Sequence, residues 1–138
     1  MVCAYCGQPT QVINSRAQKR NNQVWRRRRC KTCKALFTTH EALDLTSALF
    51  VDVGGLHKPF MGDLLYTELL LALQDQKNCY ETARDAQHTI IRRLRKLPSF
   101  PFVKPRQISQ ESAKVLKRLN QRAYLRYLAE HPSLQAES

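Results

Sequence analysis

The sequence Cys3-Ala-Tyr-Cys6, followed after residues 7–29 by Cys30-Lys-Thr-Cys33, decides how the N-terminal part of this chain folds. A pair of cysteines spaced by two residues can turn its backbone around a metal ion, and two such pairs supply the four sulfur ligands that a structural zinc prefers. Two disulfides or four unrelated thiols are the alternatives, and the paired spacing favours one zinc ion. Because the spacer is slightly longer than is usual in zinc ribbons, it predicts an extended hairpin between the pairs.

The composition limits the class of protein. The chain has 138 residues, enough for one ordinary domain or two small ones. It carries 23 Lys and Arg against 11 Asp and Glu, a net charge of +12 that indicates a polyanionic partner, most simply nucleic acid. No apolar run approaches the ~20 residues of a membrane span, and residues 1–7 show no secretory signal. Reduced zinc-binding cysteines are typical of the cytosol, so we expect a cytoplasmic protein, and we interpret the lone Cys79 as a partly buried thiol.

Residues 1–42 are predicted to form a zinc ribbon, in which a small antiparallel sheet is joined to the metal-binding turns. Polar and β-branched patterns predict strands over residues 11–15, 23–28 and 36–39, with a turn at 19–22. So short a segment cannot bury enough apolar surface to fold alone. The metal must therefore contribute part of the folding free energy.

The first forty residues are strongly basic, with nine Lys and Arg and no Asp or Glu. Arginine matches phosphate geometry with two parallel hydrogen bonds and also binds guanine edges in the major groove. Trp25 could stack on a base or close the small core. We expect a nucleic-acid surface here, with a merely solvated basic strand as the alternative. The residues expected to contact DNA are Arg16, Lys19, Arg20, Trp25, Arg26, Arg27, Arg28, Arg29 and Lys31.

The composition changes after the ribbon and predicts a second domain. Residues 43–47 are expected to be a linker, 48–132 a domain, and 133–138 a short frayed tail. A β-hairpin is predicted over 48–60, with its turn at Gly54-Gly55. The remaining predicted elements are a helix over 63–76, a helix over 80–97, a proline-containing loop over 98–105, a third helix capped by Ser109 and a fourth between Asn120 and Pro132. The chain is thus predicted to be an α+β protein, a zinc ribbon followed by a hairpin and four helices.

A second basic cluster lies at the end of the predicted second helix, where Arg92, Arg93, Arg95 and Lys96 follow one another closely. Cations in the last turn of a helix are favoured by the helix dipole. An extra anion-binding surface is the alternative interpretation. We favour helix stabilisation.

Several motifs in this order are typical of one known family. The ribbon carries C-x-x-C-G at residues 3–7, V-I-N-S-R at 12–16, R-R-R-R-C-x-x-C at 26–33 and F-T-T-x-E at 37–41, and the second unit carries H-K-P-F at 57–60 and A-Y-L-R-Y at 123–127. With these motifs the chain resembles the bacterial NrdR family, zinc-ribbon and ATP-cone repressors of ribonucleotide reductase genes. The resemblance implies a DNA-binding ribbon, a cone that binds ATP or dATP, and oligomerisation on paired promoter boxes. It makes Val51, His57, Lys58 and Phe60 the candidate nucleotide-binding residues.

The chain departs from the family pattern at the positions that would face the phosphates. Where the family's first cone strand usually carries Lys-Arg, this chain has Asp52 and Val53. The usual Glu before Pro-Phe is Lys58, and the usual Lys of the first helix falls at Leu64. A carboxylate repels a phosphate. We therefore expect nucleotide affinity to be weakened, altered or absent.

The predicted function is that of a transcriptional regulator, most simply a repressor that binds promoter DNA through the ribbon and oligomerises through the cone. The alternative is a zinc-ribbon protein associated with RNA or the ribosome. The symmetry of a dimer on two half-sites favours DNA. The sequence has no P-loop motif, and a closed four-cysteine site is structural, so we do not expect an enzyme.

Overall fold

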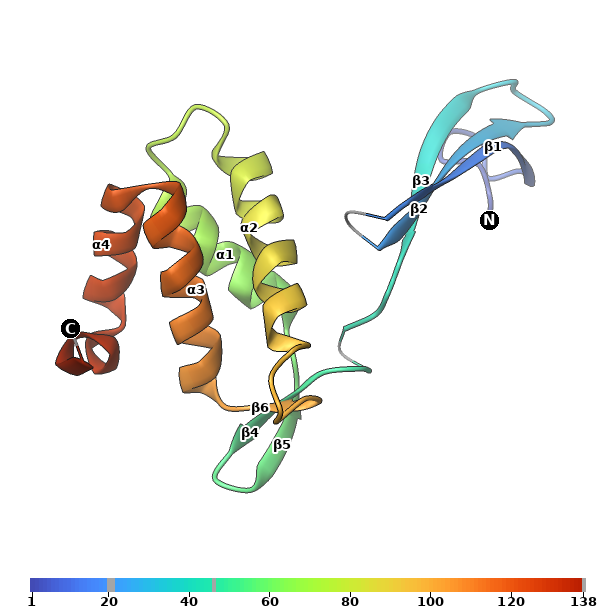
Figure 1. Cartoon of the computed structure of the whole chain (residues 1–138). Coiled ribbons are helices and arrows are strands. Elements are labelled where there is room, and N and C mark those ends of the chain that lie inside the picture. Colours follow the sequence, from blue (N-terminus) through green and yellow to red (C-terminus); the bar gives the residue numbers. More distant parts are fainter. Residues whose placement is uncertain (20–21, 46, 138) are drawn as a thin grey trace. The chain divides into compact units, whose positions relative to one another are not determined.

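The computed structural model describes residues 1–19, 22–45 and 47–137 and has an α+β architecture (Figure 1). It divides into two compact units, Met1–Asp44 and Leu45–Ser138. Each unit has a sheet of its own. Within the described residues, no helix is long and apolar enough to cross a membrane.

The first unit is a three-stranded antiparallel sheet in the order β1-β2-β3. Its strands are β1 (Thr10–Gln18), β2 (Gln23–Cys30) and β3 (Leu36–Ala42), which cover the predicted segments and extend beyond them. The register of β1 against β2 shifts between Val12 and Asn14, so one extra residue bulges from β1. The bulge determines which side chains of the two strands share a face.

The second unit begins with the predicted hairpin, β4 (Phe50–Val53) and β5 (Leu56–Pro59). Gly54 and Gly55 both have positive φ, +63° and +89°, as a tight two-residue hairpin turn requires. The carboxylate of Asp52 accepts a hydrogen bond from the Gly55 N–H at 2.8 Å. Asp52 therefore has a structural role in closing this turn.

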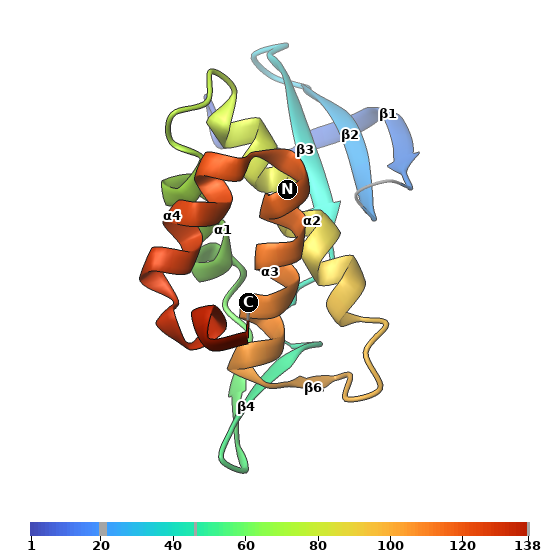
Figure 2. The same cartoon turned by 60° about the vertical axis from the view of Figure 1, so that its left-hand side comes forward.

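Four helices pack together beyond the hairpin (Figures 1 and 2). They are α1 (Gly62–Leu73), α2 (Cys79–Leu94), α3 (Pro105–Leu119) and α4 (Gln121–Glu130), followed by the 3-10 helix η1 (Pro132–Glu137). Fully buried side chains from three of the helices, Leu69, Ile90 and Leu116, belong to one apolar core. Asn120 joins α3 to α4, and its side-chain oxygen accepts from the Ala123 N–H at 3.0 Å, which caps α4.

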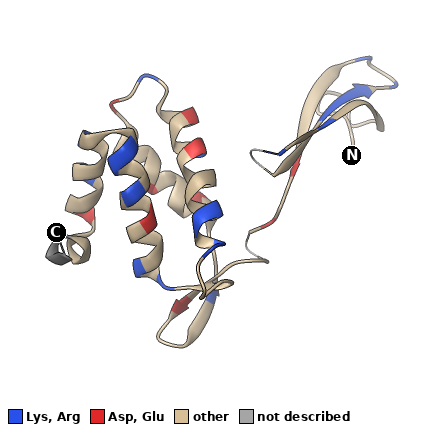
Figure 3. Cartoon of the chain, viewed as in Figure 1, with Lys and Arg blue, Asp and Glu red and all other residues tan. Residues whose placement is uncertain are grey.

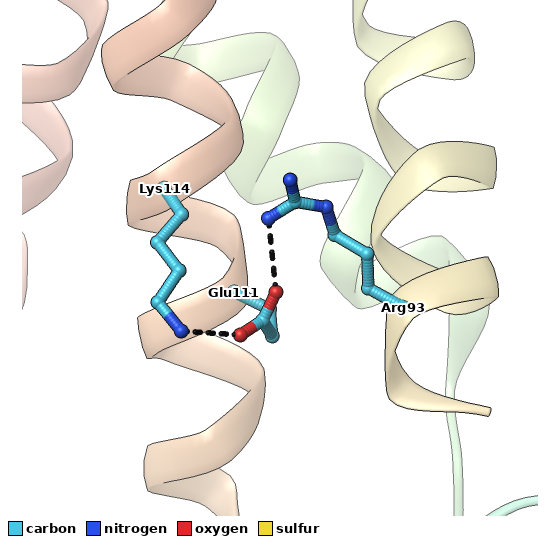
Figure 4. Close-up of polar contacts among 3 residues, drawn as sticks. All are labelled: Arg93, Glu111 and Lys114. Carbon is cyan, nitrogen blue, oxygen red and sulfur yellow. Dashed lines mark hydrogen bonds and ion pairs between the residues drawn. The ribbon is translucent and has the colours of Figure 1, made fainter. Parts of the chain in front are cut away.

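A polar contact also links α2 to α3 (Figure 4). The Arg93 Nη1 lies 3.1 Å from Glu111 Oε2, and the Lys114 Nζ lies 2.6 Å from Glu111 Oε1. The Glu111 side chain is only 12% exposed. One carboxylate therefore forms ion pairs with two cations at the helix interface.

The predicted loop over 98–105 is wrong in part, because Phe102–Val103 forms β6 and pairs in parallel with β4. The third helix also starts earlier than predicted, at Pro105, since proline suits the first helical position. Gln107 accepts a hydrogen bond from the Lys104 N–H at 2.8 Å, so the helix is capped there. Ser109 lies inside the helix, and its hydroxyl donates to the Pro105 carbonyl.

Other boundaries also differ from expectation, and the first helix ends at Leu73 instead of residue 76. The second helix ends at Leu94 instead of residue 97, although Leu97 still packs partly buried against the core. The tail is not frayed at residue 134, because Leu134 in η1 is only 8% exposed and belongs to the core. Apolar side chains can thus remain in the core after the helix that carries the pattern has ended.

Candidate metal centre and nucleic-acid interface

The four cysteines of the paired motifs meet at one point of the first unit. Their sulfur atoms all lie within 4.8 Å of one another. The Sγ atoms of Cys3 and Cys33 are 3.6 Å apart, and those of Cys6 and Cys30 are 3.5 Å apart. A tetrahedral zinc with Zn–S bonds of about 2.3 Å places its sulfurs about 3.8 Å apart. The cluster therefore has the size of a four-cysteine zinc site.

Each cysteine pair forms a tight turn that directs backbone N–H groups at sulfur. The Tyr5 N–H donates to Cys3 Sγ and the Cys33 N–H donates to Cys30 Sγ, both at 3.4 Å. Gly7 and Lys34, one residue after each pair, have positive φ of +68° and +64°. The two turns are thus built alike, and each presents its sulfurs to the same point.

The thiols cannot all lose their protons easily without a cation. The hydrogen bond that the Cys33 N–H donates to Cys30 Sγ favours the thiolate and lowers the pKa of Cys30 to about 6, although burial opposes this shift. At Cys33 the Ala35 amide also lowers the pKa, but burial and the neighbouring sulfurs outweigh it and raise the pKa to about 12. A divalent cation compensates this accumulated negative charge. The donor set therefore fits one structural zinc ion.

The arginine strand β2 divides its side chains between two faces of the sheet. Because side chains alternate along a strand, Trp25, Arg27 and Arg29 share one face, and Arg26, Arg28 and Cys30 share the other. Arg16 of β1 lies directly opposite Trp25, and its guanidinium carbon is 6.0 Å from the centre of the Trp25 ring. We call the set Arg16, Trp25, Arg27 and Arg29 the Trp25 face.

The arginines of the opposite face are engaged within the unit. Arg26 forms an ion pair with Glu41 at 2.9 Å. Arg28 donates to the hydroxyl of Thr39 at 3.1 Å and to that of Thr10 at 3.5 Å. Glu41 lies just beyond the acid-free first forty residues, so the composition of that segment did not reveal this pairing.

The Trp25 face is less engaged. Arg27 donates one hydrogen bond, to Thr38 at 3.2 Å, and Arg29 is exposed. Within the described residues, neither of these two arginines has a carboxylate partner. Their positive charge is therefore available to an external anion.

The other predicted DNA contacts are distributed around the sheet. Lys19 is exposed directly after β1 and Lys31 is exposed directly after β2. The Lys31 carbonyl accepts a hydrogen bond from Lys34 Nζ at 2.7 Å. Arg20 lies outside the described residues.

Of the four candidate nucleotide-binding residues, the structure brings Val51 and Lys58 together and places His57 and Phe60 in other surroundings. Phe60 is 2% exposed and lies in the core, and Val51 packs partly buried against that core. Lys58 is paired with Val51 and shares its face of the hairpin. His57 is on the other face, where its ring stacks on Phe102 with centroids 4.2 Å apart.

A cavity of about 460 Å³ lies elsewhere in the second unit, between α1 and α4, and was not predicted. Its lining includes Glu68, Arg126 and His131, and none of the candidate nucleotide-binding residues. Burial raises the pKa of Glu68, and nearby His131 opposes that shift. Arg126 donates to the Ala72 carbonyl and forms an ion pair with Asp75, so its charge is used within the chain.

Comparisons with known proteins cover nearly the whole chain. Residues 1–41 match the family model described as the N-terminal domain of NrdR-like transcriptional repressors. A Chromobacterium violaceum protein named transcriptional repressor NrdR is 34% identical over 98% of this chain and 89% of its own length. Proteins of the same name from Thermus thermophilus and Maricaulis maris are 33% and 32% identical over 92% of this chain, and over 81% and 79% of their own lengths.

Proposed function

Because the chain belongs to the NrdR family of transcriptional repressors, we propose that it represses ribonucleotide reductase genes by binding their promoter DNA through the Trp25 face. The family is one of repressors rather than enzymes, and its ribbon binds one structural zinc. The protein would act on the nucleoid in the cytoplasm. Residues 1–42 form the DNA-binding domain of this proposal and 48–132 its regulatory domain.

The observation that carries the proposal is the charge on the Trp25 face. Arg27 and Arg29 lie two residues apart on the central strand and present their guanidinium groups on the same side as Arg16. Consecutive side chains on one face of a strand are about 7 Å apart, so the two guanidinium groups can each contact a phosphate of the same DNA backbone. The zinc contributes by fixing Cys30 at the end of β2, which holds the strand in place.

Self-association through the second unit completes the proposal, since two ribbons joined by a dimer bind two half-sites. Exposed leucines on α1 and α4 support it. Leu64 is 63% exposed, Leu71 58% and Leu125 55%. Apolar side chains this exposed are candidates for an interface between protomers.

ATP and dATP have a reduced or absent role in this proposal. Leu64 is exposed where the family pattern has a lysine, and Asp52 uses its carboxylate to close the hairpin turn. His57 and Lys58, the basic residues nearest in sequence, are on opposite faces of the hairpin. The second unit would therefore join protomers without requiring a nucleotide.

The proposal is tested by nuclease protection of the ribonucleotide reductase promoters from the genome that encodes this protein. We expect the zinc-loaded protein to protect two neighbouring boxes, and the chelated protein to protect none. Transcript levels of those genes should rise when the gene for this protein is deleted. Protection of structured RNA with no protection of promoter DNA would contradict the proposal and support the RNA-binding alternative.

A further inference from the structure

The second unit also carries a segment without acidic residues. Residues 86–110 contain no Asp or Glu, and their Lys and Arg residues are Arg92, Arg93, Arg95, Lys96, Lys104 and Arg106. The cations gather where α2 ends and α3 begins, at the end of the unit that holds β4 and β6 (Figure 3). Basic residues at the end of α2 and at the start of α3 are thus grouped at one end of the unit.

Pairing within the chain accounts for only part of this charge. Arg93 is neutralised by Glu111, and Arg106 also interacts within the chain. The other four residues are exposed, and none has a carboxylate partner in the part of the chain that the structure describes. We call these four residues the basic edge: Arg92, Arg95, Lys96 and Lys104.

Helix stabilisation does not explain the whole basic edge. Arg92 is in the last turn of α2, where the helix dipole favours a cation. Lys104, however, is the N-cap residue of α3, and the first turn of that helix has no acidic residue. A cation at a helix N-terminus is disfavoured by the dipole, and the terminus itself attracts anions. The combined arrangement therefore suits an anionic partner.

A short linker joins the ribbon to the second unit. The strand β3 ends at Ala42, and Leu45 already packs against the core of the second unit. The intervening chain reaches roughly 10 Å when fully extended. A unit on so short a flexible tether has a local concentration in the millimolar range around the ribbon's partner, so even weak phosphate contacts become populated.

We propose that the basic edge binds the phosphate backbone of the same DNA duplex that the ribbon binds, as a second contact without sequence preference. The inference rests on the proposed DNA-binding function and extends the contact to the second unit. The partner is duplex phosphate because the edge offers exposed cations, and cations contact the phosphate backbone without reading its sequence.

The test compares two full-length, zinc-loaded variants with equal loss of charge. The first is Arg95→Gln, Lys96→Gln, Lys104→Gln on the basic edge. The control is Lys77→Gln, Arg118→Gln, Arg122→Gln, which changes exposed residues at the other end of the helices. Fluorescence anisotropy on a mixed-sequence duplex of about 40 base pairs, at a series of salt concentrations, gives affinity and salt slope.

We expect the basic-edge variant to bind roughly tenfold or more weakly near 0.1 M salt, with a salt slope flattened by about one unit for each lost phosphate contact. The control should stay near wild type. Equal affinities and slopes for both variants would overturn the inference while leaving the proposed function intact. If the unmodified protein binds no duplex, the proposed function itself fails. Loss of ATP binding in the basic-edge variant, with DNA binding unchanged, would assign the edge to free nucleotide and also overturn the inference.

Discussion

The two units of this chain are stabilised by different interactions. In the first unit the buried hydrophobic residues within the described part are Cys3 and Cys30, both at the metal centre. In the second unit all four helices contribute to one apolar core that includes Leu69, Ile90 and Leu116. The difference shows that a chain can combine a metal-stabilised sheet with a core-stabilised bundle, and that each should fail independently of the other.

Removal of the metal should have the largest effect. Cys30→Ser, or chelation of zinc, should unfold the ribbon, because binding of a structural zinc supplies about 10 kcal/mol or more to such a fold. Amide NMR signals of residues 1–44 should collapse to disordered positions, and those of the second unit should stay in place. Cys79→Ser, which changes a cysteine outside the cluster, is the matched control. A folded ribbon with no bound zinc would refute this prediction.

A core substitution should produce the reverse pattern. Leu69→Ala should lower the free energy of unfolding of the second unit by about 2–5 kcal/mol, because it leaves a cavity in a fully buried position. Zinc content and the ribbon signals should not change. Leu119→Ala on α3 is the control, since that side chain is 48% exposed and should change stability little. Equal thermal shifts for the two variants would contradict the assigned core.

Substitutions at the hairpin and at the start of α1 should have a smaller effect on stability than the core substitution. Asp52→Lys with Leu64→Lys should begin to restore ATP or dATP binding, because it returns two cations to the positions where the family pattern has them. It should also lower stability by about 1 kcal/mol through loss of the hydrogen bond to Gly55. Calorimetric titration checks the first effect and chemical denaturation the second. Micromolar nucleotide binding by the unmodified protein would contradict the impaired site.

The smallest effect concerns the contact between α2 and α3. Although burial alone would raise the pKa of Glu111, Lys114 and Arg93 outweigh it and hold the pKa below its usual value. A carboxylate with a lowered pKa in the folded state stabilises the fold above its ordinary pKa, near 4.3, and loses this contribution as the pH falls through the lowered value. Glu111→Gln should therefore be less stable near pH 7, and its disadvantage should shrink on acidification below about pH 4. A disadvantage that is constant with pH would contradict this account.

Sequence patterns predicted the parts of the fold that depend on local spacing. The cysteine pairs at Cys3 and Cys30 identified the metal cluster. Apolar periodicity, of leucines in α1 and of Ala, Ile and Leu in α2, identified the two helices, because ligand spacing and helical faces depend on short segments of sequence. The strand β6 was missed because two residues become a strand only through pairing with β4. The start of α3 was missed because Pro105 suits both a loop and a first helical position.

At the candidate DNA-binding interface, too, the sequence alone did not show contacts that form between strands. The run of arginines was visible in the sequence, and alternation along a strand divides it into two faces, but which of these arginines are engaged depends on contacts across the strands. The ion pair between Arg26 and Glu41 joins residues from neighbouring strands. Tertiary pairing, which the composition of one segment does not contain, determines which arginines remain available.

The most direct test of the DNA-binding proposal compares the two faces of β2. Arg27→Ala with Arg29→Ala removes charge from the Trp25 face, and Arg26→Ala with Arg28→Ala removes equal charge from the engaged face. Affinity for promoter DNA is measured by anisotropy against salt concentration, with zinc content confirmed for both proteins. We predict that the first pair weakens binding roughly tenfold or more and flattens the salt slope by about two units, and that the second pair changes both much less. Equal losses from the two pairs, or the larger loss from the Arg26 and Arg28 pair, would contradict the assignment of DNA binding to the Trp25 face.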